Sequence, residues 1–504
     1  MPDFFVKLNG RIDRRSPRDE GDPTSPVLRE NWISRDGKLS KPLGHEAVIT
    51  GLSGIPRWEG RYNTVESSVV SPKSFVYTED GVIYVLDDAL GTASEAKALL
   101  NTNAYPNHVL FKTGSQNKLF FVDGEFMYSH DGNNDNLFLK VDLDDADGNS
   151  VAPIDLIEHK DRLFVISKTK MFVSKNLQPT VFDDATDSLE IVVGSGKGTN
   201  LALRKLEDRL YILNTEGIFI LDGDVISALA STFEVRLVDD RKIIAGRTAV
   251  AVEKAIVFLA DDYELWSWDG SMAQMLSFEL KLKDFIFQNR AMLDKAVAVY
   301  DNNFYKMSFV ENGAVEPNLE VWWDAFENKI DIVRGRHVSS YMKTDSTIET
   351  EYTELGQSNA NTIMRDSRGF DFGGVAIASR IRSRDLTIKK GFNLRFLAFY
   401  FQFLPTGIRS LTIKYLLDGR LSNPTGAHAN WSQSLRGETK TLGFIEIKNQ
   451  AQATGRVRPK IKYSRGESIA FEISESVKGQ QSDFLGIGID YLAKQRSKGI
   501  TIGA

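Results

Sequence analysis

The 504-residue sequence contains no cysteine. A chain without thiols can form neither disulfides nor thiolate zinc sites, and it offers no cysteine nucleophile. Its opening residues, MPDFFVKLNGRIDRR, lack the apolar core of a secretory signal peptide. No run of about 18 apolar residues occurs, so we expect no membrane span. The six histidines have no metal-pair spacing, HExxH included. These absences predict a protein without a metal site or a cofactor.

Net charge is also low, at −6, but it is unevenly distributed. Residues 377–504 hold 21 Lys and Arg against 9 Asp and Glu, a balance of +12, whereas the rest of the chain holds 41 against 59, or −18. The acidic part argues against tight phosphate binding there. The basic part suits nucleic acid or an acidic face of a neighbouring subunit. We favour the subunit, because the basic residues alternate with apolar ones along expected strands.

One β-hairpin pattern recurs through the middle of the chain. In residues 254–270, KAIVFLADDYELWSWDG, two short β-prone stretches flank an Asp-Asp turn. Similar hairpins begin at residues 75, 119, 163, 210, 255 and 296, and a weaker copy begins at residue 338. A β repeat of this period predicts a propeller of six four-stranded blades, or seven if the weak copy is counted. Residues 94–100, SEAKALL, have helical character, and we interpret them as a loop insertion.

Beyond the repeats the pattern changes to strands of a different kind. Residues 392–404, FNLRFLAFYFQFL, are apolar on both faces, which is typical of a central sandwich strand or a strand at a subunit interface. Further short strands are expected at 411–417, 468–474 and 484–492, and together they predict a β-sandwich. The expected all-β organisation is an N-terminal arm with entry strands at 1–72, the propeller at 73–357 and a basic sandwich docking domain at 358–504. The predicted interface residues are Arg380, Arg382, Arg384, Phe399 and Phe401.

Two loops resemble ligand sites but depart from the required patterns. The glycine-rich run 193–199 lacks the spacing of a phosphate loop, and Gly198 stands where Ser or Thr should follow the lysine. Residues 142–148 resemble a calcium loop, but Leu143 and Ile154 occupy positions that the EF-hand register assigns to carboxylates. A flexible turn and a solvated acidic loop are the simpler explanations, and a looser calcium site stays open for the second.

Paired acidic residues and tryptophans offer two further possibilities. Asp239/Asp240 and Asp261/Asp262 resemble glycosidase carboxylate pairs, but hairpin turns also recruit aspartate for backbone reasons. The pairs Trp266/Trp268 and Trp322/Trp323 suit a sugar-stacking platform, although blade packing is the commoner use of such rings. We therefore predict no catalytic residues and no enzymatic activity.

The opening and the end of the chain resemble one family of phage proteins. KLNGRID followed by LRENWISRDGKLSKPLG is similar to the start of propeller-type structural proteins of tailed bacteriophages, with Pro42-Leu43-Gly44 where Arg-Pro-Gly is more usual. FDFGG, LRFLAFYFQFLPTGIRSLTIKYLLDG, KYSRGESIAFEIS and FLGIGIDYL resemble their C-terminal sandwich. The resemblance implies a tail nozzle or hub protein of a short-tailed phage. Such proteins commonly form a hexameric ring around the DNA channel, below an adaptor ring, with fibres or tailspikes attached outside.

On this resemblance the chain is expected in the virion tail after assembly in the host cytoplasm. Genomic DNA would pass through the lumen without sequence-specific contact, and an acidic propeller half facing the lumen would let it slide. Two other functions stay open. A receptor- or glycan-binding propeller requires the four tryptophans to gather on one exposed rim. A glycoside hydrolase or lyase requires two or three carboxylates that converge in the central channel.

Overall fold

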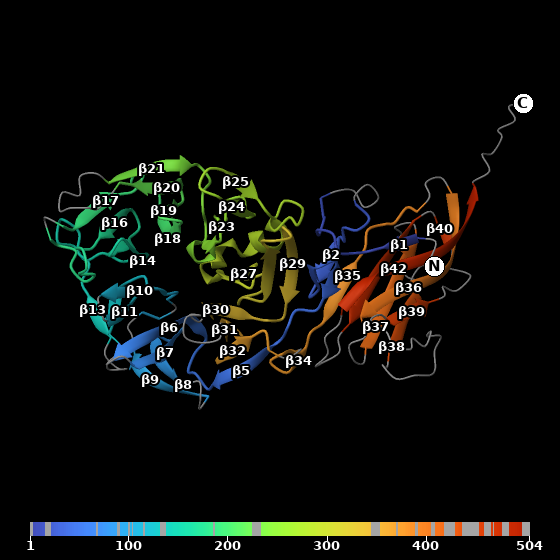
Figure 1. Cartoon of the computed structure of the whole chain (residues 1–504), viewed down its shortest axis with the longest axis horizontal. Coiled ribbons are helices and arrows are strands. Elements are labelled where there is room, and N and C mark those ends of the chain that lie inside the picture. Colours follow the sequence, from blue (N-terminus) through green and yellow to red (C-terminus); the bar gives the residue numbers. More distant parts are fainter. Residues whose placement is uncertain are drawn as a thin grey trace, which may run out of the picture.

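The computed structural model describes two β-domains that lie side by side, a ring of radiating sheets and a smaller sandwich (Figure 1). The described residues are 4–15, 22–66, 69–87, 91–98, 101–102, 104–113, 116–131, 138–184, 187–223, 233–343, 353–368, 371–388, 392–404, 409–417, 429–435, 453–457, 465–466, 468–475 and 483–495. Within them the helical segments are short, namely η1 (Gly246–Thr248), α1 (Lys283–Ile286) and η2 (Phe287–Lys295). The predicted combination of a β-propeller and a β-sandwich is confirmed.

The first three blades are four-stranded antiparallel sheets made from consecutive strands. Their strands are β6 (Pro56–Glu66), β7 (Val69–Thr78), β8 (Val82–Asp87) and β9 (Thr92–Ala98); β10 (Asn107–Thr113), β11 (Gln116–Val122), β12 (Met127–His130) and β13 (Leu139–Val141); and β14 (Asp155–His159), β15 (Arg162–Ile166), β16 (Lys170–Val173) and β17 (Leu189–Val192).

The next three blades follow the same plan. Their strands are β18 (Asn200–Leu206), β19 (Arg209–Asn214), β20 (Gly217–Asp222) and β21 (Glu234–Asp239); β22 (Val250–Val252), β23 (Ala255–Leu259), β24 (Leu265–Trp268) and β25 (Ala273–Met275); and β26 (Val297–Asp301), β27 (Phe304–Phe309), β28 (Leu319–Asp324) and β29 (Lys329–Arg334).

The seventh blade joins two distant parts of the chain. It consists of β30 (Val338–Lys343), β31 (Thr353–Gln357), β32 (Thr362–Asp366) and the early strand β5 (His45–Thr50), which pairs antiparallel with β32. The small hairpin of β33 (Asp371–Phe372) and β34 (Val375–Ala376) continues this sheet beyond β5. The innermost strand of each blade contacts that of the next, and β30 contacts β6, so the ring is closed with seven blades.

The hairpin pattern of residues 254–270 is confirmed, because β23 and β24 pair antiparallel with Leu259 opposite Leu265. The copies at 75, 119, 163, 210 and 255 fall on the second and third strands of their blades. The copies at 296 and 338 fall one strand earlier, on β26 with β27 and on β30. The repeat was therefore real, but its alignment slipped by one strand because first and second strands have similar apolar patterns.

Apolar clusters fill the spaces between most neighbouring blades. Phe75 and Tyr77 of the first blade, for example, pack with Leu119 and Phe121 of the second, and all four are fully buried. Equivalent clusters join blades two to three, three to four, four to five and five to six, and another joins seven to one. Each fully buried side chain of this kind contributes about 1.5–3 kcal/mol. Each of blades one to five therefore packs its two faces against the neighbouring blades.

The second domain is a sandwich of two sheets around one apolar core. One sheet contains β1 (Phe4–Val6), β3 (Ile33–Arg35), β4 (Lys38–Ser40), β36 (Phe392–Leu404), β39 (Ala453–Val457), β40 (Arg465–Gly466) and β42 (Asp483–Gln495). The other contains β2 (Leu28–Glu30), β35 (Ser379–Arg382), β41 (Ile469–Glu475), β37 (Arg409–Leu417) and β38 (Ala429–Leu435). Strand β36 matches the predicted central strand, and it lies between β42 and the strands β39 and β40.

The strand β2 links the two domains into one sheet. It pairs parallel with β29 of the sixth blade on one side and antiparallel with β35 of the sandwich on the other. Arg29 and Asp331 form a fully buried ion pair across the β2–β29 junction, with 2.6 Å from Nε to Oδ1. Asn31 extends the link by donating to the carbonyls of Arg334 and Ala378. Strands β29, β2 and β35 lie next to one another where the two domains meet (Figure 1).

The domain boundaries in the structure differ from those expected. Strands β5, β6 and β7 begin within 1–72 yet belong to the propeller, and β32 lies beyond residue 357 but belongs to it as well. Strands β1 to β4 join the sandwich side rather than forming a separate arm. The expectation of a helical insertion at 94–100 was wrong over its described residues, because β9 is the outer strand of the first blade. Pairing with β8 overrides the helical propensity of this segment.

The buried ion pair gives a stability prediction. Arg29→Met should lower the free energy of unfolding by about 3–5 kcal/mol, because it leaves the Asp331 carboxylate buried without its cation. Urea denaturation followed by tryptophan fluorescence measures this change. The double variant Arg29→Met with Asp331→Leu, which removes both charges, should recover most of the loss. A single variant as stable as the parent chain would show that the pair does not tie the domains together.

Candidate functional site

The predicted interface residues divide between the surface and the interior of the sandwich. Arg380 on β35 is exposed, and its Nη2 donates to Glu472 Oε2 at 2.8 Å. Arg382 is half-buried on the same strand. Arg384 is 1% exposed. The structure therefore leaves β35 with one exposed arginine, while the third arginine serves an internal contact.

The internal contacts are well defined. Arg384 Nη2 lies 2.5 Å from Asp13 Oδ2 and also donates to the Asp13 carbonyl, which fastens the N-terminal segment to the sandwich. Phe399 is fully buried in the sandwich core against Phe471, with ring centroids 4.9 Å apart. Phe401 belongs to β36, but its side chain lies outside the described residues. Whether any of these residues meets a partner chain stays a prediction.

The tryptophans do not form an exposed platform. Trp268, Trp322 and Trp323 are 1%, 6% and 8% exposed. Trp266 is half-buried, and the guanidinium of Arg241 covers its ring at 3.7 Å from the centroid. Trp268 packs edge-on against Tyr211 of the fourth blade at 4.6 Å. These rings stabilise blades four to six, so the arrangement required for sugar stacking is absent from these four residues.

The paired aspartates make the contacts of turn residues. Asp262 accepts hydrogen bonds from the Trp266 indole at 3.1 Å and from the backbone of Glu264 at 3.1 Å. Asp239 Oδ1 accepts from the backbone N–H of Arg241 at 2.8 Å. These side chains satisfy local backbone donors at strand ends.

The two loops that resemble ligand sites are also satisfied internally. Residues 193–199 form the turn from β17 to β18, where the backbone of Ser195 donates to Glu216 at 3.1 Å. In the acidic loop, Asp145 accepts from the backbones of Asp147 and Asn149 at 3.1 and 2.8 Å. Across the described ranges, no group of three or more His, Asp or Glu side chains is placed to hold a metal ion.

A polar cluster joins the first and fifth blades across the centre of the propeller. Arg57 lies on β6 of the first blade and Arg247 on η1 before the fifth, yet Arg247 Nη2 donates to the Arg57 carbonyl at 2.9 Å. These blades are not neighbours, so the contact spans the axis. Tyr105 lies between the two guanidiniums, 5.3 and 5.1 Å from its ring centroid. Arg57 also binds Glu79 at 2.9 Å and Glu316 at 3.1 Å.

Burial determines the protonation states of this cluster. Burial raises the pKa of Tyr105 to about 12, and burial lowers the pKa of Arg247 to about 10. Near neutral pH the phenol is therefore neutral and both guanidiniums are charged. The carboxylates of Glu79 and Glu316 are held by Arg57, so they are not free to act as the acid and base of a glycosidase.

The densest set of buried charges lies between the sixth and seventh blades. Lys306 on β27 is 2.7 Å from Asp301 and 2.8 Å from Asp366, which ends β32 of the neighbouring blade. Arg336, in the connection from β29 to β30, lies 2.6 Å from the second oxygen of Asp366 and 3.3 Å from Glu320. The Tyr341 hydroxyl donates to Glu320. These charged groups lie beside an apolar cluster in which Phe304 and Trp322 of the sixth blade pack with Phe372 of the seventh sheet.

The buried charges compensate one another. Burial opposes ionisation of Asp366, but Arg336 and Lys306 outweigh it and hold the pKa of that carboxyl well below its usual range. Burial raises the pKa of Glu320, and Arg336 opposes this rise. The ring of Trp322 lies beneath both cations, at 4.7 Å from Lys306 and 5.1 Å from Arg336. Sequence reasoning missed this network, although a lysine within the apolar strand FYKMSF is a usable signal of a buried charge.

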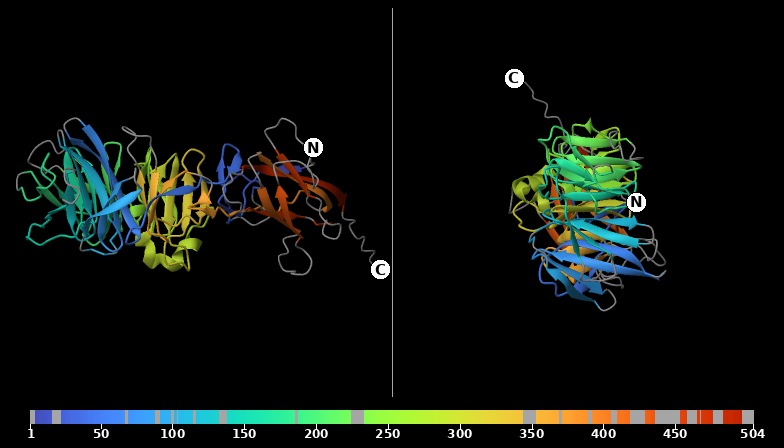
Figure 2. Two further views of the ribbon diagram at one scale, coloured as in Figure 1. Left: turned by 90° about the horizontal axis from the view of Figure 1, so that it is seen from below. Right: turned by 90° about the vertical axis from the view of Figure 1, so that its left-hand side faces the viewer.

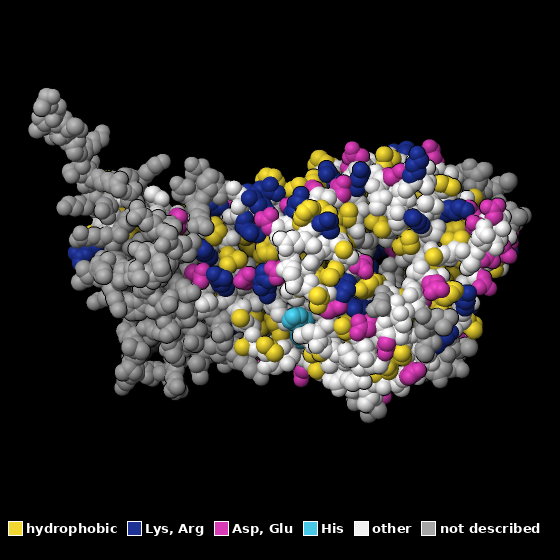
Figure 3. All heavy atoms as spheres, turned by 180° about the vertical axis from the view of Figure 1, so that it is seen from behind, with side chains coloured by type: hydrophobic (Ala, Val, Ile, Leu, Met, Phe, Trp, Pro, Cys, Tyr) yellow, Lys and Arg dark blue, Asp and Glu magenta, His cyan; other side chains and the backbone are white. Residues whose placement is uncertain are grey.

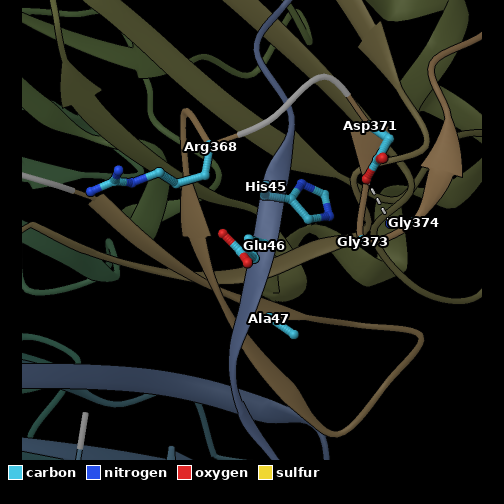
Figure 4. A pocket seen from close by; sticks show the side chains of 7 residues that line it. All are labelled: His45, Glu46, Ala47, Arg368, Asp371, Gly373 and Gly374. Carbon is cyan, nitrogen blue, oxygen red and sulfur yellow. Dashed lines mark hydrogen bonds between the residues drawn. The ribbon is translucent and has the colours of Figure 1, made fainter. Parts of the chain in front are cut away.

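A shallow pocket of about 340 Å³ lies beside β5, lined by His45, Glu46, Ala47, Arg368, Asp371, Gly373 and Gly374 (Figure 4). The His45 ring stacks in parallel on Phe372 at 5.2 Å. Burial and then the charge of Arg336 lower the pKa of His45 to about 3, so this imidazole stays neutral. Asp371 Oδ1 accepts from the Gly374 backbone at 2.8 Å. These seven residues include no hydroxyl or amine nucleophile, and their arrangement indicates a turn packed on the seventh blade.

Comparison with known proteins gives structural neighbours only. No protein-family model matches the chain, and no curated protein matches it. Among solved structures, BBS1N in complex with ARL6DN shares 12% identity over 68% of this chain and 98% of that chain, with a TM-score of 0.43. Chaetomium thermophilum Raptor shares 9% identity over 68% of this chain and 30% of that chain, with a TM-score of 0.44. These values assign neither a family nor an activity.

None of the described helical segments has the length and apolar character for crossing a membrane.

The network between blades six and seven makes stability depend on pH. Asp366→Asn should cost about 3–5 kcal/mol near neutral pH, because Lys306 and Arg336 lose their shared anion. The pKa of Asp366 is lowered in the fold, so its contribution is complete above about pH 4 and declines as the pH falls further. The difference between parent and variant should therefore shrink from about pH 7 to about pH 3, as measured by urea unfolding.

The exposed Asp261 provides the control for this experiment. Asp261→Asn, in the β23–β24 turn, should change the free energy of unfolding by less than about 0.5 kcal/mol at either pH. An Asp366→Asn variant that behaves in the same way would contradict a role for the buried network in ring closure.

Proposed function

We propose that this chain is a structural component of the tail of a short-tailed bacteriophage, a nozzle or hub protein. In this role it assembles with copies of itself into a hexameric ring around the DNA exit channel. Adaptor and fibre or tailspike proteins dock to the ring, and DNA passes through without sequence-specific contact. The proposal assigns the chain to the virion tail, with assembly in the host cytoplasm, and it includes no catalytic step.

The observation that carries the proposal is the sheet that runs through both domains. Blade six, β2 and the sandwich form one hydrogen-bonded series of nine strands. Buried groups such as Arg29 and Asp331 reinforce its centre. A continuous sheet resists bending between the domains better than a flexible linker, as a load-bearing tail component requires. The resemblance of the first strands and of the sandwich to phage propeller proteins points in the same direction.

The alternative functions have less support. A glycan-binding propeller required four tryptophans on one exposed rim, and three of them are buried. A glycoside hydrolase required convergent carboxylates in the channel, where Glu79 and Glu316 are engaged by Arg57. We therefore place the function in surfaces rather than in a chemical site. The exposed Arg380 on the basic sandwich stays our candidate for contact with a neighbouring subunit, with Arg382 beside it.

Native mass spectrometry and cryo-EM class averages of the purified chain test this proposal. We expect a six-fold ring with an open lumen lined mainly by acidic side chains. Arg380→Glu with Arg382→Glu should weaken each subunit contact by roughly 1–2 kcal/mol and raise the monomer fraction. Lys197→Glu, an exposed charge reversal in the β17–β18 turn, is the matched control and should leave the ring intact. A stable monomer at all concentrations would overturn the proposal, and a basic lumen would overturn the sliding role of the acidic half.

A further inference from the structure

The connection from blade five to blade six carries a helical insertion that projects from one face of the propeller. Its helical segments, α1 and η2, form the coiled ribbon that protrudes from the ring in both views (Figure 2). Leu280, Leu282 and Ile286 anchor it in the apolar cluster between the two blades. An insertion anchored in this way presents a preformed surface.

Polar contacts also fasten the insertion to the β27–β28 loop. The backbone of Asn312 donates to the Phe285 carbonyl at 2.8 Å, and its side chain accepts from the backbone of Gln288 at 2.9 Å. Asn289 donates to the Ala314 carbonyl at 2.8 Å. These bonds join the insertion to the next hairpin on the exposed side. They hold the backbone of the insertion against this hairpin.

The outer face of the insertion presents an aromatic ring between two cations. Phe287 is 42% exposed, and its ring lies 5.1 Å from both Lys283 Nζ and Arg290 Cζ. Tyr263 supports the same ring edge-on at 5.2 Å. Lys283 Nζ also lies 5.9 Å from the Tyr263 ring, and Arg290 Nη1 donates to the Phe287 carbonyl at 3.5 Å. Stacking on a ring restricts both side chains while leaving their charges available.

A second ring extends this surface toward the N-terminal segment. Phe278 is 54% exposed, and the Arg15 guanidinium lies 4.1 Å from its centroid. Arg15 is partly neutralised by Glu264 at 3.3 Å. Seen from behind, Lys and Arg side chains with hydrophobic ones between them gather over the part of the propeller next to the sandwich (Figure 3). This concentration contrasts with the acidic balance of the sequence outside residues 377–504.

We infer that the surface formed by Lys283, Phe287 and Arg290, with Arg15 and Phe278 beside it, docks an acidic segment of a partner protein. Two cations, each 5.1 Å from the centroid of one exposed ring, suit two carboxylates that flank an apolar side chain. Rings and arginines of this type supply most of the binding energy at protein interfaces. A nucleic acid fits less well, because its evenly spaced phosphates would also meet the exposed Asp284 and Asp294. This inference does not depend on the phage proposal.

Selection from a displayed library of short random peptides against the full chain tests the inference. Enriched peptides should contain Asp or Glu on both sides of an apolar residue. In fluorescence anisotropy, Lys283→Glu with Arg290→Glu should weaken binding of the most enriched peptide about tenfold, and Phe287→Ala should weaken it similarly. As a control, Lys254→Glu reverses an exposed charge in the β22–β23 turn of the fifth blade. It should change the affinity for the peptide by less than about twofold.

Three outcomes would overturn the inference. In the first, no selected peptide prefers the parent chain to the double variant. In the second, the enriched peptides lack acidic residues. In the third, single-stranded oligothymidine binds more tightly than the peptides and the same substitutions abolish that binding, which would assign the surface to nucleic acid. Circular dichroism of each variant confirms that the fold is retained. Because this experiment does not measure oligomeric state, its failure would not affect the proposed ring, and failure of the ring experiment would not affect the docking surface.

Discussion

Buried charges join the sixth blade of the propeller to the seventh, in which β5 and β32 close the ring. Elsewhere in the ring, apolar side chains of neighbouring blades interdigitate, and hydrophobic burial tolerates small shifts. At this junction Lys306 and Arg336 must each reach Asp366 with hydrogen-bonding geometry. Ion pairs buried in this way add little net stability over apolar residues, but they penalise any arrangement that separates the charges. The junction therefore fixes the position of the blade whose strands come from both parts of the chain.

The N-terminal segment supplies strands to both domains. Strand β5 completes the seventh blade, β2 continues the sixth blade into the sandwich, and β1 pairs with β42. The two domains therefore do not correspond to two separate stretches of sequence. Arg29 and Arg384 illustrate the result, since each is a buried arginine with its carboxylate partner in a distant part of the chain. In the described structure, the charges of these two arginines are used in buried ion pairs within the chain.

The fold was largely predictable because alternating apolar residues and turn signals report directly on strands. The hairpins and the central strand at 392–404 were identified from such local patterns. The closure of the seventh blade was not predictable, because no local sequence pattern in β5 indicates that it pairs with the distant strand β32. The same limit applies to sites. Aspartate turns were recognised from neighbours in sequence, whereas the network around Asp366 joins charges from separate strands. The ring between Lys283 and Arg290 went unnoticed because its segment has no strong periodic pattern.

The pairing of β5 with β32 sets the order in which a growing chain can complete its fold. His45 and Gln357, which contact each other in the seventh blade, are 312 residues apart. During translation, six blades are synthesised after β5 and before its partner β32. The edge of β5 that pairs with β32 stays unpaired during that time. Long-range pairing of this kind slows folding and exposes edges to wrong partners. Strand β5, like β1 and β2, therefore meets its partner strand only after most of the chain has been translated, and neither domain can be completed before then.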